Sequence, residues 1–309
     1  MKDKKTIKNV AASIRQRLYN RARDRGEDFN LILSRYAVER FLQRLSQSPY
    51  AGKFILKGAQ LFSLWSEMPH RITRDLDLLG KGESAIAELE ALFRVVCKQP
   101  VDFPDGIEFA ADTVKGEEIR EQAKYKGVRI RLMYVLAEAK DILQIDIGFG
   151  DIVTPRAKFV EFPSLLEFLP VRLKAYSRET VIAEKFQALV MLGIGNSRMK
   201  DFYDLFILSG AFHFDGAVLS PAIAATFRRR KTTMPQEIPL ALTNEFAHNA
   251  AKQKQWHGFL NKNGLQPAQV HLAAVIEKLR EFLIPPTTAF AKEKTFKQIW
   301  PPGGPWRKK

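Results

Sequence analysis

The sequence predicts an α+β protein, in which a small mixed sheet is flanked by N-terminal helices and followed by a helical C-terminal domain. Apolar residues recur at helical spacing through residues 6–48, short apolar or alternating segments follow, and helical spacing returns at residue 178. The expected divisions are N-terminal basic helices in 1–50, a sheet core in 51–165, a helical domain in 166–290 and a basic flexible tail in 291–309.

The element boundaries follow from glycine, proline and apolar spacing. Gly26 interrupts the N-terminal helices, and Pro49 with Gly52 closes them. Helices are expected over 59–65, 83–97 and 178–192, and strands over 54–58, 73–79, 128–135 and 142–149. The proline- and glycine-rich stretch 300–305 excludes regular structure in the tail.

Composition narrows the class of protein. With 309 residues and 46% hydrophobic content, the chain has room for two domains and is not globally disordered. Because it lacks both an apolar run of about eighteen residues and an apolar N-terminal signal, we expect a cytoplasmic protein with no membrane partner. Cys97 is the single cysteine, and the five histidines show no zinc-ligand spacing.

The positive charge points to a polyanionic partner. The net charge is +15, and it is clustered in Arg15, Arg17, Arg21, Arg23 and Arg25, in residues 228–231, and in residues 307–309. A solvated surface explains any one of these clusters, but together they favour binding of nucleic acid or of an acidic partner.

Two carboxylates form the candidate metal site. On a strand, Asp75 and Asp77 project from the same face, and their mutual repulsion is relieved by a divalent cation such as Mg²⁺. Asp146 stands between Ile145 and Ile147 on a later strand, so it is a candidate third metal ligand or general base. A solvated strand edge is the alternative for an isolated Asp-x-Asp pair.

Upstream, Lys57-Gly58-Ala59 forms a candidate phosphate-binding turn. A glycine between a strand and a helix lets backbone N–H groups approach a phosphate.

These segments resemble the AbiEii/AbiGii toxin family within the DNA polymerase β-like nucleotidyltransferases. The resemblance covers about residues 50–210 and rests on Lys57-Gly58-Ala59 with Arg71-Ile72-Thr73-Arg74-Asp75-Leu76-Asp77, on a Glu-Lys-x-x-Ala helix at 184–188, and on an Arg-x-x-Lys-Asp-x-x-Asp block that starts at Arg198 but has one residue fewer between its Arg and Lys. A basic strand motif matches Lys126, Arg129 and Arg131 only loosely, and Ala59 replaces the second Gly or Ser usual in the family.

The resemblance implies a small mixed-sheet nucleotidyltransferase core and a Mg²⁺-dependent toxin that transfers NMP from an NTP. The implied acceptor is RNA, most specifically the 3′ end of tRNA, and its modification would block translation. The implied partner is a cognate antitoxin, and the implied biological role is in a toxin–antitoxin or phage-defence pair. Asp75, Asp77 and Asp146 would bind the metal. Arg71 and Arg74, just before the Asp-x-Asp pair, either contact phosphates or flank a turn.

Lys185 and Asp201 complete the candidate site. Lys185 is placed to reach a triphosphate as a point charge, or else forms a Glu–Lys pair or a snorkelling lysine. Asp201 and Asp204 share one helix face, so they either hold a lysine or supply a base. Two other functions stay open: a non-catalytic module that binds RNA or a partner, and a nucleotidyltransferase acting on a protein or small molecule.

Overall fold

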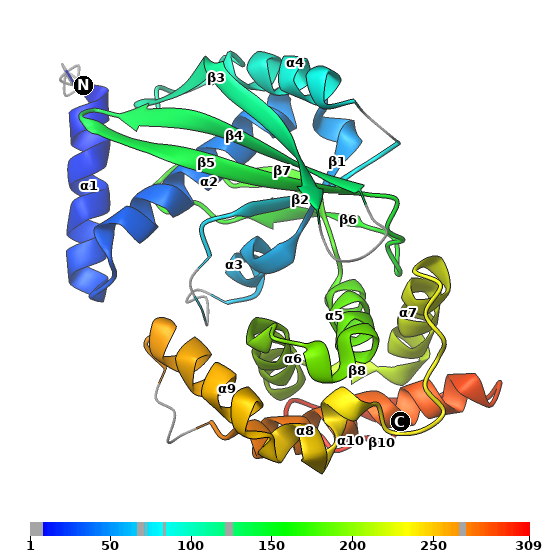
Figure 1. Ribbon diagram of the computed structural model, residues 1–309. Coiled ribbons are helices and arrows are strands. Elements are labelled where there is room, and N and C mark those ends of the chain that lie inside the picture. Colours follow the sequence, from blue (N-terminus) through cyan, green and yellow to red (C-terminus); the bar gives the residue numbers. More distant parts are fainter. Residues whose placement is uncertain (1–8, 67–70, 72, 83–84, 121–125, 266–269) are drawn as a thin grey trace. The chain divides into compact units, whose positions relative to one another are not determined.

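The computed structural model describes residues 9–66, 71, 73–82, 85–120, 126–265 and 270–309. The chain forms two compact units, unit 1 with Met1–Gly150 and Lys158–Ala175, and unit 2 with Asp151–Ala157 and Tyr176–Lys309. Unit 1 contains the large sheet and unit 2 is mainly helical (Figure 1), which confirms the predicted α+β class. The boundary differs from the expected one, since a strand of the sheet continues to Ala175.

Unit 1 begins with two capped helices. The side chain of Asn9 accepts a hydrogen bond from the Ala12 N–H at 2.9 Å and starts α1, and Gly26 ends it in the left-handed conformation, as the sequence predicts. Asp28 caps the next helix in the same way. The helices of the unit are α1 (Val10–Arg25), α2 (Phe29–Gln47), α3 (Phe62–Trp65) and α4 (Ile86–Cys97), with 3₁₀ turns η1 (Ala51–Lys53) and η2 (Gly58–Leu61).

The sheet of unit 1 is mixed and has the strand order β3-β4-β5-β2-β1-β7-β6. Strand β2 runs parallel to β5 and β1 runs parallel to β7, and the other neighbouring pairs are antiparallel. The strands are β1 (Phe54–Lys57), β2 (Leu76–Gly80), β3 (Ile107–Arg120), β4 (Lys126–Leu136), β5 (Ala139–Phe149), β6 (Lys158–Phe162) and β7 (Val171–Ala175).

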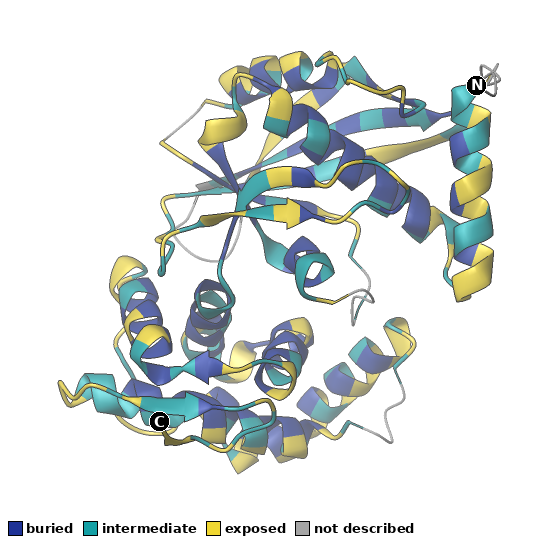
Figure 2. Cartoon of the chain, turned by 180° about the vertical axis from the view of Figure 1, so that it is seen from behind, coloured by how far each residue is buried: buried dark blue, intermediate teal, exposed yellow. Residues whose placement is uncertain are grey.

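The core of unit 1 lies between this sheet and helices α2 and α4. Phe41 of α2 stacks on Phe93 of α4 at 5.7 Å between ring centroids, and Phe54 of β1 and Phe109 of β3 contact the same pair. Helix α2 is buried along most of its length, whereas α1 buries a single stripe, Ile14, Leu18 and Ala22, and exposes its other side (Figure 2). Side chains on the opposite face of the sheet remain accessible for a site.

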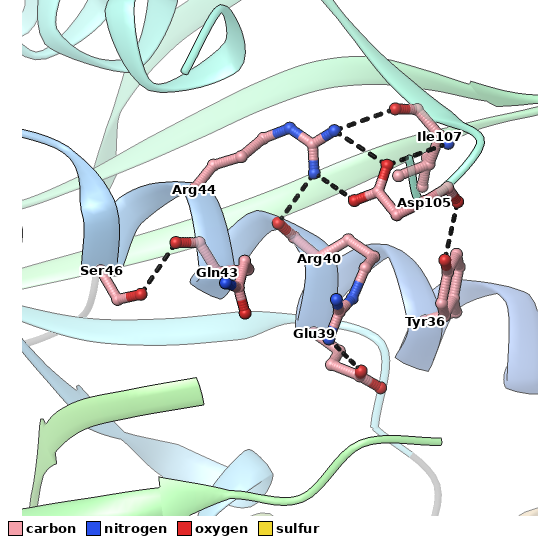
Figure 3. A network of polar contacts seen from close by, with 8 residues as sticks. All are labelled: Tyr36, Glu39, Arg40, Gln43, Arg44, Ser46, Asp105 and Ile107. Carbon is pink, nitrogen blue, oxygen red and sulfur yellow. Dashed lines mark hydrogen bonds and ion pairs between the residues drawn. The ribbon is translucent and has the colours of Figure 1, made fainter. Parts of the chain in front are cut away.

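A buried ion pair fixes α2 to the chain segment that enters β3 (Figure 3). Arg44 donates to both carboxylate oxygens of Asp105, at 2.7 and 3.1 Å, and to the Ile107 carbonyl at 3.1 Å. The Tyr36 hydroxyl donates to the Asp105 carbonyl at 2.7 Å. Glu39 forms an ion pair with its neighbour Arg40. These contacts satisfy charges that burial would otherwise make costly.

The sheet is larger than the sequence predicts. Strands β3, β6 and β7 were not expected, and β2 starts at Leu76, so Asp75 lies just before the strand. The expected helix over 59–65 is divided into η2 and the single-turn α3.

Unit 2 packs helices around a small three-stranded sheet of order β10-β9-β8. Residues 301–305 form neither helix nor strand, as the sequence predicts, but short strands flank them in the tail. Trp300 is fully buried, and its indole donates to the Ser209 carbonyl at 2.7 Å. None of the described helices is long and apolar enough to cross a membrane. The elements are α5 (Arg178–Leu192), η3 (Gly193–Gly195), α6 (Met199–Ala211), β8 (Phe214–Asp215), α7 (Gly216–Arg229), η4 (Leu240–Leu242), α8 (Asn244–His248), α9 (Ala250–Lys262), α10 (Leu272–Ala291), β9 (Gln298–Trp300) and β10 (Arg307–Lys308).

Candidate active site

Gly58 closes strand β1 and brings the backbone of the following turn against the carboxylate of Asp77. Its φ is +73°, a conformation that favours glycine, and an added Cβ would lie 1.9 Å from the Asp77 Oδ2 atom. Ala59, the expected second small residue, is buried within the same turn. The turn is a 3₁₀ segment, so the backbone N–H groups, rather than a long helix, are what it can offer a phosphate.

Charged residues occupy matching positions on five neighbouring strands. In the strand register, Lys57 is opposite Asp77, Asp77 is opposite Asp146, Asp146 is opposite Arg129, and Arg129 is opposite Glu117. We call these five residues the charged row. It lies on the face of the sheet opposite helix α4, because Phe54, which alternates with it along β1, packs on Phe93. The predicted carboxylates Asp77 and Asp146 are therefore direct neighbours.

Asp146 is held by Arg129 through two hydrogen bonds. The guanidinium Nε and Nη2 atoms lie 2.8 and 2.7 Å from the two carboxylate oxygens. The hydrogen bonds to Asp146 raise the pKa of Arg129. The loose family match at Arg129 thus corresponds to a defined contact, and bidentate pairing fixes the orientation of the carboxylate.

Asp75 lies next to this row, at the start of β2. Its Oδ1 accepts a hydrogen bond from the Gln144 amide at 3.1 Å, and its backbone carbonyl accepts one from Gln60 at 3.3 Å. Gln144 is on β5, two residues before Asp146, so both predicted acidic positions are positioned by that strand. Sequence reasoning missed Gln144, although its alternation with Asp146 was a usable signal.

The carboxylates fit a magnesium ion only in part. Mg²⁺ in nucleotide-binding sites commonly uses one or two carboxylates and takes its other ligands from phosphates and water, a role that Asp75 and Asp77 can fill. Among the described residues, no group of three or more His, Cys, Asp or Glu side chains has the arrangement to hold a metal ion. The assignment of Asp146 as third ligand stays a prediction, because Arg129 occupies both of its oxygens.

The basic residues of the motif differ in position. The Lys57 side chain extends across β2, since a Cβ at Gly148 of β5 would lie 2.9 Å from its ammonium nitrogen. Glycine at 148 therefore leaves room for this charge beside the carboxylates. Arg74 is exposed and Arg71 is half-buried just before the Asp-x-Asp pair, and their phosphate contacts remain predictions.

Unit 2 contains a second charged cluster. Lys185 of α5 lies 2.7 Å from Asp201 and 2.8 Å from Asp204, both on α6, and Arg198 lies 2.6 Å from Asp201. The two aspartates share one helix face, as their spacing predicts, and are completely buried. Burial alone would raise the pKa of Asp201, but Lys185 and Arg198 outweigh it and lower that pKa. Lys185 is thus positioned between two buried carboxylates, and its contact with a phosphate oxygen stays a prediction.

The residues of the basic block at 228–231 are not all exposed on the surface. Arg230 forms ion pairs with Asp151 at 3.0 Å and with Glu184 at 3.3 Å, and donates to Gln187 at 2.9 Å. Glu184 therefore pairs with Arg230, while Lys185 pairs with Asp201 and Asp204. Arg228, Arg229 and Lys231 remain exposed.

Two solved structures are similar to this chain. A crystal structure of a proposed nucleotidyltransferase from H. pylori is 14% identical, with a TM-score of 0.46, and the match covers 84% of this chain and 96% of that chain. The crystal structure of JHP933 from Helicobacter pylori is 13% identical, with a TM-score of 0.41, covering 83% and 95%. No curated protein matches the chain.

The family assignment rests on sequence. Residues 40–283, most of the chain and including both charged clusters, match the family described as nucleotidyl transferase AbiEii toxin of type IV toxin–antitoxin systems. The chain belongs to this AbiEii nucleotidyltransferase toxin family.

Proposed function

We propose that the protein transfers an NMP group from an NTP to a hydroxyl of RNA, with the 3′ end of tRNA as acceptor, and that Mg²⁺ is required. The observation that carries this proposal is the charged row, in which Asp77 and Asp146 are adjacent, with Lys57 and Arg129 on either side. The Gly58 turn against Asp77 adds backbone donors for phosphate oxygens.

The reaction follows from these groups. The acceptor hydroxyl oxygen attacks the α-phosphorus, a new P–O bond forms, and the bond from the α-phosphorus to the bridging oxygen breaks. Pyrophosphate leaves, and the hydroxyl proton passes to a carboxylate or to water. A bound Mg²⁺ supplies charge neutralisation at the phosphates, with Asp75 and Asp77 as its protein ligands. Lys57 contributes a positive charge beside them.

An RNA acceptor is supported by charge. Along α1, the side chains of Arg17, Arg23 and Arg25 are exposed, and the chain carries a net charge of +15. Contacts of this kind bind phosphates without reading the sequence. As a member of a toxin–antitoxin family, the protein is proposed to act with a cognate antitoxin, and transfer to tRNA would block translation.

The test uses Mg²⁺, each labelled NTP in turn, and total bacterial tRNA. Wild type is compared with Asp75→Asn/Asp77→Asn and with Asp141→Asn, an exposed aspartate on the same strand as Asp146. Label in tRNA from wild type and Asp141→Asn, but not from the double variant, is the expected result.

Other outcomes separate the alternatives. Label on a protein or small molecule would keep the chemistry and replace the acceptor. Tight RNA binding without transfer of any nucleotide would contradict the enzymatic proposal and favour a non-catalytic binding module.

A further inference from the structure

Unit 1 contains a hollow of about 500 Å³ that none of the predicted metal ligands lines. Its walls come from α1, α2, η2, α3, the end of β6 and the connection between β6 and β7, and include Arg21, Arg25, Arg35, Trp65 and Ser164. Gln60, which donates to the Asp75 carbonyl, also lines it, so the hollow adjoins the catalytic segment. Its volume is within the range of small-molecule sites.

Three arginines and two glutamates, Glu39 and Glu161, line this hollow, so positive charge exceeds negative by one. Arg35 lies 2.8 Å from Glu27 and Arg25 lies 3.9 Å from it, so the two share one carboxylate. Arg21 has no hydrogen bond or ion pair with the described residues, and its Nε atom is buried without an acceptor. Burial and the neighbouring Arg25 both lower the pKa of Arg21. An anion in the hollow would supply the missing acceptor and relieve the repulsion.

The nearby Glu39 does not fill that role. Its carboxylate pairs with Arg40 and accepts hydrogen bonds from the Ser164 hydroxyl at 2.6 Å and the Leu165 N–H at 2.8 Å. These partners hold the carboxylate in the wall of the hollow. The positive charge of Arg21, which forms no ion pair with the described residues, consequently remains available to a ligand.

The remaining walls select among anions. Trp65 is half-exposed and lines the hollow, with Phe62 against it in an edge-on contact at 5.3 Å. Indole faces stack on nucleobases, and the hydroxyls of Ser63 and Ser66 in the same wall suit a sugar. A phosphate, a sugar and a flat ring together make a nucleotide.

We propose that this hollow is a second nucleotide-binding site, in which Arg21 and Arg25 hold a phosphate group and Trp65 stacks on the base. It is separate from the proposed donor-NTP site and needs no metal ion. Its occupant is either a free nucleotide or a nucleotide within an RNA strand, since both present the same chemistry.

The test measures binding in EDTA with the full-length Asp75→Asn/Asp77→Asn protein, so that metal-dependent binding is removed. Titration calorimetry measures the binding of AMP, CMP, GMP, UMP, inorganic phosphate and a single-stranded RNA hexamer. Arg21→Gln is compared with Arg23→Gln, an exposed arginine of the same helix that does not line this hollow. Trp65→Leu tests the base contact.

We expect Arg21→Gln to weaken nucleotide binding at least tenfold, about 1.4 kcal/mol, and Arg23→Gln to leave it within twofold. Binding of mononucleotides supports a free occupant, and binding of the hexamer alone supports an RNA occupant. Equal losses in both arginine variants, or no binding of any nucleotide, would overturn the proposal. Phosphate binding as strong as that of nucleotides, unchanged in Trp65→Leu, would overturn the nucleotide assignment. None of these outcomes depends on catalytic activity.

Discussion

Replacing Asp201 by asparagine should destabilise unit 2, because the carboxylate is completely buried between two cations. Lys185 lies 2.7 Å and Arg198 2.6 Å from it. Breaking a buried ion pair commonly costs about 3–5 kcal/mol. Arg198 is 41% exposed and can turn to water, and Lys185 keeps Asp204 at 2.8 Å. We therefore expect a loss near the lower end, about 3 kcal/mol.

The loss should depend on pH in a defined direction. The pKa of Asp201 is lower in the folded protein than its ordinary value, so its stabilisation is present above that ordinary value and is lost as the pH falls through the folded value. The difference between wild type and Asp201→Asn should therefore be constant from about pH 7 to pH 5 and shrink below about pH 4.

Urea unfolding followed by tryptophan fluorescence measures this difference. Trp256, Trp300 and Trp306 belong to unit 2, so the signal reports mainly on that unit. Glu281→Gln is the control, since Glu281 is 49% exposed in its pair with Lys278 and should cost no more than about 0.5 kcal/mol. A loss below 1 kcal/mol for Asp201→Asn, or one equal to the control, would refute the reasoning.

Three further predictions concern unit 1. Gly58→Ala should reduce nucleotidyl transfer about 100-fold in the labelled-NTP assay, because its Cβ would displace the Asp77 carboxylate; undiminished transfer would contradict this. Cys97 should not react with a thiol reagent at pH 8 until urea is added, since burial raises its pKa to about 12; rapid native labelling would count against it. Arg44→Met should cost about 3–5 kcal/mol in urea unfolding by leaving the buried Asp105 carboxylate without its bidentate partner, and a cost under 1 kcal/mol would be inconsistent with the contact.

Periodicity identifies some strands of this fold and conceals others. Strands β4 and β5 alternate cleanly, as in Ile145-Asp146-Ile147, and both were predicted. Strand β3 was missed because its register shifts between Ala110 and Lys115, which interrupts the alternation, and because it carries many charges. Strands β6 and β7 are five residues each, too short to distinguish them from loops. Strand β7 alternates apolar with charged residues, whereas Phe159-Val160 interrupts the alternation in β6.

The candidate site was predictable where its residues are close in sequence. Gly58, Asp75 and Asp77 lie within one segment, and their spacing predicted a common site. Arg129 pairs with Asp146 because β4 and β5 are neighbouring strands in a register that places the two residues opposite each other. This register could not be predicted from the sequence. Arg230 reads as part of a solvated basic block, and only the fold places it between Asp151 and Glu184.

The charged row changes the physical argument for the metal. From the sequence, adjacent carboxylates need a cation because their repulsion is otherwise costly. In the fold, Lys57 is opposite Asp77 and Arg129 is bound to Asp146, so each of these two carboxylates has a basic residue of the chain next to it. The carboxylates are therefore compatible with a folded sheet before any metal binds. What a divalent cation adds is its affinity for phosphate oxygens, which links metal binding to the arrival of a nucleotide rather than to the stability of the sheet.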